Sequence, residues 1–279
     1  MAGWDRRTPW RQGHVLVAET VIALHLVPDV DLASTVVVVV SHDCDLAQDP
    51  GTEPSVEVIV GRRVNVADGN FTHGKNPRRL HLSAVEAGAA MCVELTATAR
   101  QSIPKENLAG HLPNATIAID AANRNTLQRW LAARYRRSAF LDDFDNYLVE
   151  KDIPRRLAKI LGPLGNHIVA VFFDVDEGEE RTHESADDPF TLSIDLLYST
   201  DTDPVAAEAA ATKAAAEITT VFRERYFDNK AQRWSAIELL HCTPISDEAL
   251  TYAMSLRLKR WNADYISLRA DPVQPMVVE

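Results

Sequence analysis

Serine, histidine, cysteine and two aspartates follow one another at residues 41–45, directly after the five consecutive valines of residues 36–40. A run of β-branched residues is typical of a buried strand, and we expect the polar residues at its end to carry chemistry. Successive side chains of a strand point to opposite faces, so we expect the histidine and cysteine on one face and the aspartates on the other. The predicted catalytic residues are His42, Asp43, Cys44 and Asp45.

These residue types fit three kinds of site. A nucleophilic Cys44 would need a neighbouring imidazole, such as that of His42, to lower the pKa of its thiol. Alternatively, carboxylates would hold Mg²⁺ or another divalent metal for phosphoryl chemistry, because such ions prefer oxygen ligands. The predicted metal ligands are Asp43, Asp45 and Glu57. A zinc site that mixes cysteine, histidine and aspartate is the third alternative.

A structural interpretation of the same residues stays open. In it, Cys44 is a small buried apolar residue, and the two aspartates accept hydrogen bonds from backbone amides in a turn. Other chemistries lack their motifs, since the sequence contains no GxSxG elbow, HExxH helix or phosphate-binding P-loop. We therefore expect neither nucleoside triphosphate hydrolysis nor zinc proteolysis. Glu57 also lacks the lysine that would complete the Glu-x-Lys strand of restriction-type nucleases.

Two basic segments are predicted to bind phosphate. Residues 73–79, HGKNPRR, would place cations and backbone amides in one loop, with an imidazole close behind it. Residues 134–137, RYRR, combine arginines with a tyrosine that suits base stacking. The predicted phosphate-binding residues are Lys75, Arg78, Arg79, His81, Arg134, Arg136 and Arg137. An exposed loop and a helix end whose cations complement the helix dipole are the structural alternatives.

Composition limits the class of protein. With 279 residues, 46% hydrophobic and 25% charged, the chain is long enough for two domains and ordinary for a globular protein. A net charge of −11 opposes indiscriminate binding of a phosphate backbone. Three widely spaced cysteines argue against a disulfide framework, and no segment is apolar enough to span a membrane. We expect a cytoplasmic protein with reduced thiols and no membrane partner.

Hydrophobic patterning predicts an α+β fold in three parts. Residues 1–115 read as a β-rich region of barrel or sandwich type, with strands near residues 13–20, 35–41, 56–60 and 91–98. Residues 116–166 read as a helical section. Residues 167–279 are predicted to form a mixed sheet with helices on one side, in the order β-β-α-β-α-β. There, an antiparallel strand pair precedes an alanine-rich helix capped by Asp203, and a helix from Ser246 to about residue 260 precedes a closing strand at residues 265–268.

Part of the chain resembles a known family. Residues 11–16 (RQGHVL), followed by residues 36–41 (VVVVVS) and 56–60 (VEVIV), resemble the barrel of the MazF/PemK type of toxin endoribonuclease over residues 11–62. In that family a Gly-Asp-Val strand precedes a VVVxS-like strand. His14 stands here where the family has aspartate, and the C-terminal half has no counterpart. The resemblance implies a related small barrel and transfers RNA cleavage to no residue of this chain.

Together these features predict a nucleic-acid-directed role with a metal-dependent hydrolytic step. In this hypothesis the carboxylates bind the metal and the arginines position phosphates. The alternative is a non-catalytic interaction or assembly subunit, bound to a protein partner or to a second copy of itself, in which residues 41–45 are structural. The sequence leaves open whether the protein is an enzyme.

Overall fold

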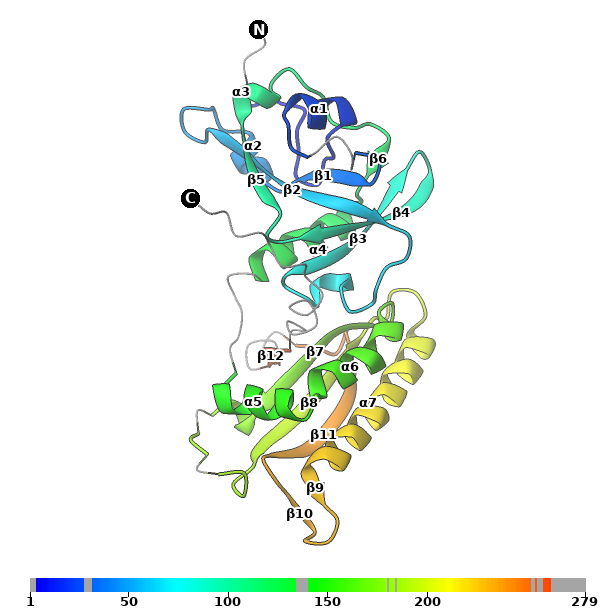
Figure 1. Cartoon of the computed structure of the whole chain (residues 1–279). Coiled ribbons are helices and arrows are strands. Elements are labelled where there is room, and N and C mark those ends of the chain that lie inside the picture. Colours follow the sequence, from blue (N-terminus) through cyan, green and yellow to red (C-terminus); the bar gives the residue numbers. More distant parts are fainter. Residues whose placement is uncertain are drawn as a thin grey trace. The chain divides into compact units, whose positions relative to one another are not determined.

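The computed structural model describes residues 4–27, 32–133, 140–179, 181–183, 185–251, 254 and 258–261 (Figure 1). The chain divides into two compact units, each formed from two separate stretches of sequence. Unit 1 comprises Met1–Ala67 and Pro77–Tyr135, and unit 2 comprises Asp68–Asn76 and Arg136–Glu279. Both units combine helices with strands, so the predicted α+β class is confirmed. The predicted helical section is divided, because its first helix belongs to unit 1 and the others to unit 2.

Unit 1 contains a curled antiparallel sheet in the order β1-β2-β4-β3-β6, with β5 paired to β2. Its strands are β1 (Thr35–Val39), β2 (Ser55–Val64), β3 (Arg79–Glu86), β4 (Ala89–Thr96), β5 (Arg100–Pro104) and β6 (Ile117–Ala118). The long strand β2 changes partner on one edge, where β5 pairs with residues 55–59 and β4 with residues 62–64. On its other edge, β1 pairs with residues 58–62.

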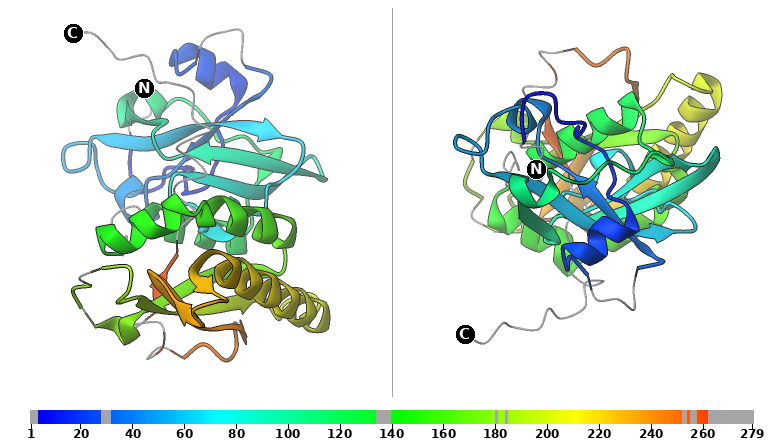
Figure 2. Two further views of the ribbon diagram at one scale, coloured as in Figure 1. Left: turned by 60° about the horizontal axis from the view of Figure 1, so that its bottom comes forward. Right: turned by 90° about the horizontal axis from the view of Figure 1, so that it is seen from above.

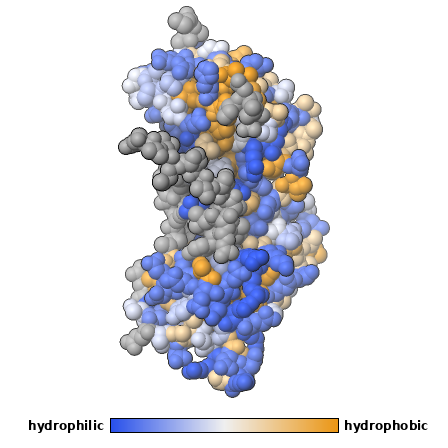
Figure 3. Space-filling model, in the orientation of Figure 1, coloured by the Kyte–Doolittle hydropathy of each residue, from blue (hydrophilic) through white to orange (hydrophobic). Residues whose placement is uncertain are grey.

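Both faces of β1 are buried, as its valine run predicts. Val36 and Val38 pack in one core with Trp130, whereas Val37 and Val39 pack in a second core. The helices of unit 1 are α1 (Ala18–Ala23), α2 (Asp43–Leu46), α3 (Lys105–Leu108) and α4 (Ala121–Ala133). Apolar surface gathers around α1 (Figure 3), where the side chain of Ile22 is 45% exposed.

Unit 2 is a two-layer arrangement of a mixed sheet and three helices. The sheet has the order β11-β8-β7-β12, and its strands are β7 (Ile168–Val175), β8 (Phe190–Tyr198), β11 (Ile237–Ser246) and β12 (Lys259–Arg260). Strands β7 and β8 are antiparallel, as predicted, while β11 runs parallel to β8. Figures 1 and 2 show the longer helices on one face of this sheet: α5 (Asp142–Glu150), α6 (Ile153–Leu161) and α7 (Pro204–Tyr226). A two-strand ribbon, β9 (Phe227–Asp228) and β10 (Arg233–Trp234), follows α7.

Local sequence signals explain some boundaries of unit 2. The predicted cap of α7 is confirmed, because Asp203 Oδ1 accepts a hydrogen bond of 2.9 Å from the amide of Ala206. The aromatic residues Phe144, Phe173 and Phe190 pack together in the core between helices and sheet. Three one-turn helices complete the described elements: η2 (Thr72–Gly74), η3 (Gly162–Leu164) and η4 (Asp176–Gly178).

Three predicted elements differ from the structure. The predicted strand at residues 13–20 is wrong beyond Leu16, because α1 begins at Ala18. The predicted helix from Ser246 to about residue 260 differs at both ends, since residues 247–249 form a turn and β12 lies at residues 259–260. Between them Met254 is helical, and residues 252–253 and 255–257 lie outside the described residues. The predicted basic loop at residues 73–79 overlaps β3 at its last residue, since β3 begins at Arg79, and His81 lies on the extended stretch predicted behind the loop. The predicted strand at residues 265–268 lies outside the described residues. In the part of the chain that the structure describes, no helix is long and apolar enough to cross a membrane.

Candidate functional site

The turn that follows β1 is helical rather than extended. Strand β1 ends at Val39, and the helix α2 begins at Asp43 with His42 as its N-cap. The ring nitrogen Nδ1 of His42 accepts a hydrogen bond of 3.3 Å from the amide of Cys44. The predicted separation of residues 42–45 onto two strand faces is therefore wrong, because a side chain of this segment caps a new helix. All four predicted catalytic side chains are exposed, which also contradicts a buried Cys44.

Buried groups hold this exposed turn in place. The indole Nε1 of Trp4 donates a hydrogen bond of 2.8 Å to the carbonyl of Leu46. The ammonium group of Lys105 donates to the carbonyls of Asp45, at 2.6 Å, and of Gln48, at 2.9 Å. Lys105 is fully buried, and burial lowers the pKa of its side chain. Trp4 and Lys105, which are distant from this turn in the sequence, therefore fix the backbone of residues 42–45.

A loop at residues 11–14 lies beside the turn. The carboxylate Oδ1 of Asp43 accepts a hydrogen bond of 2.8 Å from the backbone amide of Gln12. The side chain of Gln12 donates to the carbonyl of Val40 at 2.7 Å and accepts from Gln128 Nε2 at 2.7 Å. Part of the structural interpretation holds here, because Asp43 does bind a backbone amide. The same contacts join this loop, α2 and α4 into one site.

Gly13 allows this loop to approach α4 closely. Its φ angle is +84°, a conformation that favours glycine, and its amide donates a hydrogen bond of 2.8 Å to the carbonyl of Val39. A Cβ atom at this position would lie 2.9 Å from Cγ of Arg124 on α4. The absence of a side chain therefore lets the arginine stem lie across the loop.

His14 is a hydrogen-bond donor at neutral pH. Its Nδ1 accepts a hydrogen bond of 3.1 Å from the amide of Arg11. Burial lowers the pKa of His14, as do the charges of Arg11 and Arg124, whereas Asp43 opposes them. The ring is therefore neutral at pH 7. Because Nδ1 accepts, the proton of the neutral ring lies on Nε2. A hydrogen bond to the backbone of Pro9 raises the pKa of His14 and so also opposes the shift.

Two guanidinium groups flank this imidazole. Arg11 uses one nitrogen to donate to the carbonyls of Thr8, at 2.7 Å, and Trp10, at 2.6 Å. One nitrogen of Arg124 donates to the carbonyl of Ile119 at 2.6 Å. Each planar guanidinium carries further N–H groups beyond the nitrogen held in this way. We call Arg11, Gln12, His14, Asp43 and Arg124 the His14 cluster, and its two arginines and one aspartate leave it a net positive charge.

Two of the predicted phosphate-binding residues bind a carboxylate instead. His81 Nε2 lies 2.9 Å from Oε2 of Glu94, and Arg79 lies 3.7 Å from the same oxygen. Arg62 donates to the other oxygen at 2.7 Å. The hydrogen bond from His81, together with Arg62 and Arg79, lowers the pKa of Glu94 to about 2 although burial opposes the shift. His81 and Glu94 are buried, so this network stabilises the sheet of unit 1.

The basic loop at residues 73–79 is divided between the units. Lys75 belongs to unit 2, where its buried Nζ donates a hydrogen bond of 2.8 Å to the carbonyl of Ile168. Arg78, Arg79 and His81 belong to unit 1, and Arg78 is partly exposed. The remaining predicted phosphate ligands lie outside the described residues: Arg134, Arg136 and Arg137.

The predicted metal ligands are not gathered around one point. Asp43 binds the loop at residues 11–14, and Glu57 Oε2 accepts a hydrogen bond of 2.6 Å from Arg100. Within the described ranges of the chain, no group of three or more histidine, cysteine, aspartate or glutamate side chains is arranged to hold a metal ion.

Sequence reasoning missed most of the His14 cluster. It selected Asp43 but not Arg11, Gln12 or Arg124, and it considered His14 only for the family resemblance. One available signal was the spacing of Arg124 and Gln128, which places both on the same face of the predicted helix. Comparison with protein-family models, curated protein sequences and solved structures found no match. The barrel resemblance therefore stays a prediction.

Proposed function

We propose that unit 1 binds nucleic acid, and that the His14 cluster receives a backbone phosphate. A phosphate group offers acceptor oxygens and negative charge. The cluster supplies matching groups, namely the guanidinium groups of Arg11 and Arg124, each held through one nitrogen and each with further N–H groups. The charge of Asp43 is partly compensated, because its Oδ1 already accepts a backbone N–H. This convergence of donors is the observation that carries the proposal.

Rigidity and location support the same function. The loop and the turn are fixed by hydrogen bonds from buried or partly buried groups, so the donors need little ordering before they bind. The His14 cluster is locally positive although the net charge of the whole chain is −11, so it would attract a phosphate that the rest of the chain repels. Helix α4 also carries the exposed Arg129. A strand bound at the cluster would pass close to the exposed turn at residues 42–45, where a hydrolytic step and a divalent ion stay predictions.

Binding of short labelled RNA and DNA over a salt series tests the proposal. Arg11→Gln/Arg124→Gln should weaken binding and lower the slope of log affinity against log salt by about 0.7, the contribution of one phosphate contact in a single strand. Strand cleavage is read from the same samples with Mg²⁺ or with EDTA.

Lys213→Gln/Lys230→Gln is the matched control, since it removes two exposed cations from unit 2 and produces the same change in net charge. We expect this control to bind like the wild type. Absence of wild-type binding at low salt, or an equal loss of affinity in the control, would overturn the proposal.

A further inference from the structure

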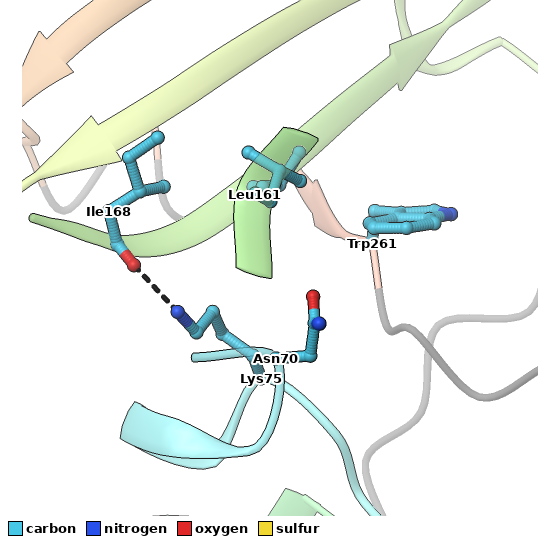
Figure 4. Close-up of a pocket in the computed structure, with 6 residues that line it drawn as sticks. Asn70, Lys75, Leu161, Ile168 and Trp261 are labelled. Carbon is cyan, nitrogen blue, oxygen red and sulfur yellow. Dashed lines mark hydrogen bonds between the residues drawn. The ribbon is translucent and has the colours of Figure 1, made fainter. Parts of the chain in front are cut away.

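Unit 2 contains a small cavity into which a buried lysine projects (Figure 4). The cavity has a volume of about 20 Å³. Lys75 follows the turn η2 and is 8% exposed, and its Nζ donates one hydrogen bond, of 2.8 Å, to the carbonyl of Ile168. Within the described residues, the Nζ of Lys75 makes this one hydrogen bond, although a lysine ammonium group has three N–H donors. Asn70, Leu161, Ile168, Val171 and Trp261 form the rest of the lining.

The surroundings of Lys75 favour the neutral amine. Burial lowers the pKa of Lys75 to about 7, the positive charge of Arg260 adds to the effect, and Asp68 opposes it. Arg260 is held in place, since its NH2 donates to the carbonyls of His73, at 3.0 Å, and Val169, at 3.1 Å. The neutral amine, with a lone pair on Nζ, is therefore populated near pH 7. A neutral lysine amine is a nucleophile.

The size and the walls of the cavity select the electrophile. A volume of about 20 Å³ holds little more than one water-sized guest. Four of the lining side chains are apolar, namely Leu161, Ile168, Val171 and Trp261, and Asn70 contributes the one amide. Phosphorylated compounds, sugars and substituted aldehydes are too large or too polar to enter. Carbon dioxide is small, linear and without charge, so it meets both requirements.

We propose that Lys75 is a reversible carbamylation site for carbon dioxide. The lone pair of neutral Nζ attacks the carbon atom and forms an N–C bond, while one C–O π pair moves onto oxygen. Nitrogen then releases one proton to solvent, so one amine and one CO₂ give one carbamate anion and one proton. The carbamate keeps a single N–H, which suits the carbonyl of Ile168, and its negative charge is favoured by Arg260. The amide of Asn70 supplies a donor at the cavity wall.

Carbon-13 NMR of the full-length protein, equilibrated with ¹³C-bicarbonate near pH 7, tests this site. We expect a carbamate carbon signal that disappears in CO₂-free buffer and in Lys75→Arg. Arginine keeps the positive charge but is not nucleophilic, and circular dichroism verifies that this variant folds. Trapping with a trialkyloxonium reagent, followed by mass spectrometry, should locate the ethylated adduct on the peptide that contains Lys75.

Lys230→Arg is the matched control, because it makes the same substitution at an exposed position of unit 2. The free amino terminus also forms carbamates, so the signal that counts is the one lost in Lys75→Arg and kept in Lys230→Arg. A signal that survives Lys75→Arg unchanged, or the absence of any adduct on the Lys75 peptide, would overturn the proposal.

Discussion

At the scale of single residues, the carboxylate of Glu94 is the shared partner of Arg62, Arg79 and His81 in the sheet of unit 1. Its pKa is lowered from 4.5 to about 2 by His81, Arg62 and Arg79. A lowered pKa in the folded state stabilises the protein above the unfolded pKa, and this stability is lost as pH falls from about 4.5 toward 2. We expect the free energy of unfolding to fall by about 2–3 kcal/mol across this window. Urea denaturation at a series of pH values measures it.

Glu94→Gln should remove this pH dependence and destabilise the protein by about 2–4 kcal/mol at pH 7, because it removes the carboxylate that pairs with the nearly buried Arg79 and accepts a hydrogen bond from the buried His81. Glu86→Gln is the control, since Glu86 pairs with Arg63 where both side chains are about one third exposed. Exposed pairs contribute little, so this variant should retain the wild-type pH profile. If the free energy of unfolding depended on pH in the same way in Glu94→Gln and the wild type, Glu94 would not be the source of the pH dependence.

At the scale of elements, the close approach of β2 to β4 depends on Gly61. Near this residue one edge of β2 changes its partner from β5 to β4, while the other edge stays paired with β1, and a Cβ atom would lie 2.6 Å from the carbonyl oxygen of Glu94. Since that oxygen belongs to the backbone, the strands would have to separate. We expect Gly61→Ala to destabilise unit 1 by about 1–3 kcal/mol, measured by thermal denaturation. Gly110→Ala, where no atom lies within 4 Å of the added Cβ, should have a much smaller effect.

Individual helices and strands differ in how well the sequence predicts them. Elements with strong local signals were predicted well: β1 by its valines, the β7 and β8 pair by two apolar runs, and α7 by the Asp203-Pro204 start. Strand β3 was predicted only as an extended stretch at His81, because the basic residues before it indicated a loop, although Leu80, Leu82 and Ala84 alternate along it. The His14 cluster was missed for a different reason. Its members come from segments far apart in the sequence, and their meeting depends on tertiary packing.

At the scale of the whole molecule, the chain passes between the two units three times. Residues 68–76 leave unit 1 between β2 and β3 and become part of unit 2. There, Lys75 binds the carbonyl of Ile168, and Thr72 Oγ1 donates to the carbonyl of Gly165 at 3.3 Å. The C-terminal half of the sequence therefore does not form unit 2 alone, because residues 68–76 are also part of that unit. Close backbone contact holds this segment in place.

Gly69→Ala tests how strongly the inserted segment stabilises unit 2. A Cβ atom at Gly69 would overlap the carbonyl oxygen of Gly162 and lie 2.7 Å from Cα of Gly165. Both are backbone contacts that no side-chain rotation can relieve, so we expect a loss of about 3 kcal/mol. Hydrogen exchange should accelerate in α6 and β7, which border the segment, and stay unchanged in β1 of unit 1. Gly110→Ala again serves as the control, and equal acceleration in both units would show that the segment does not act locally.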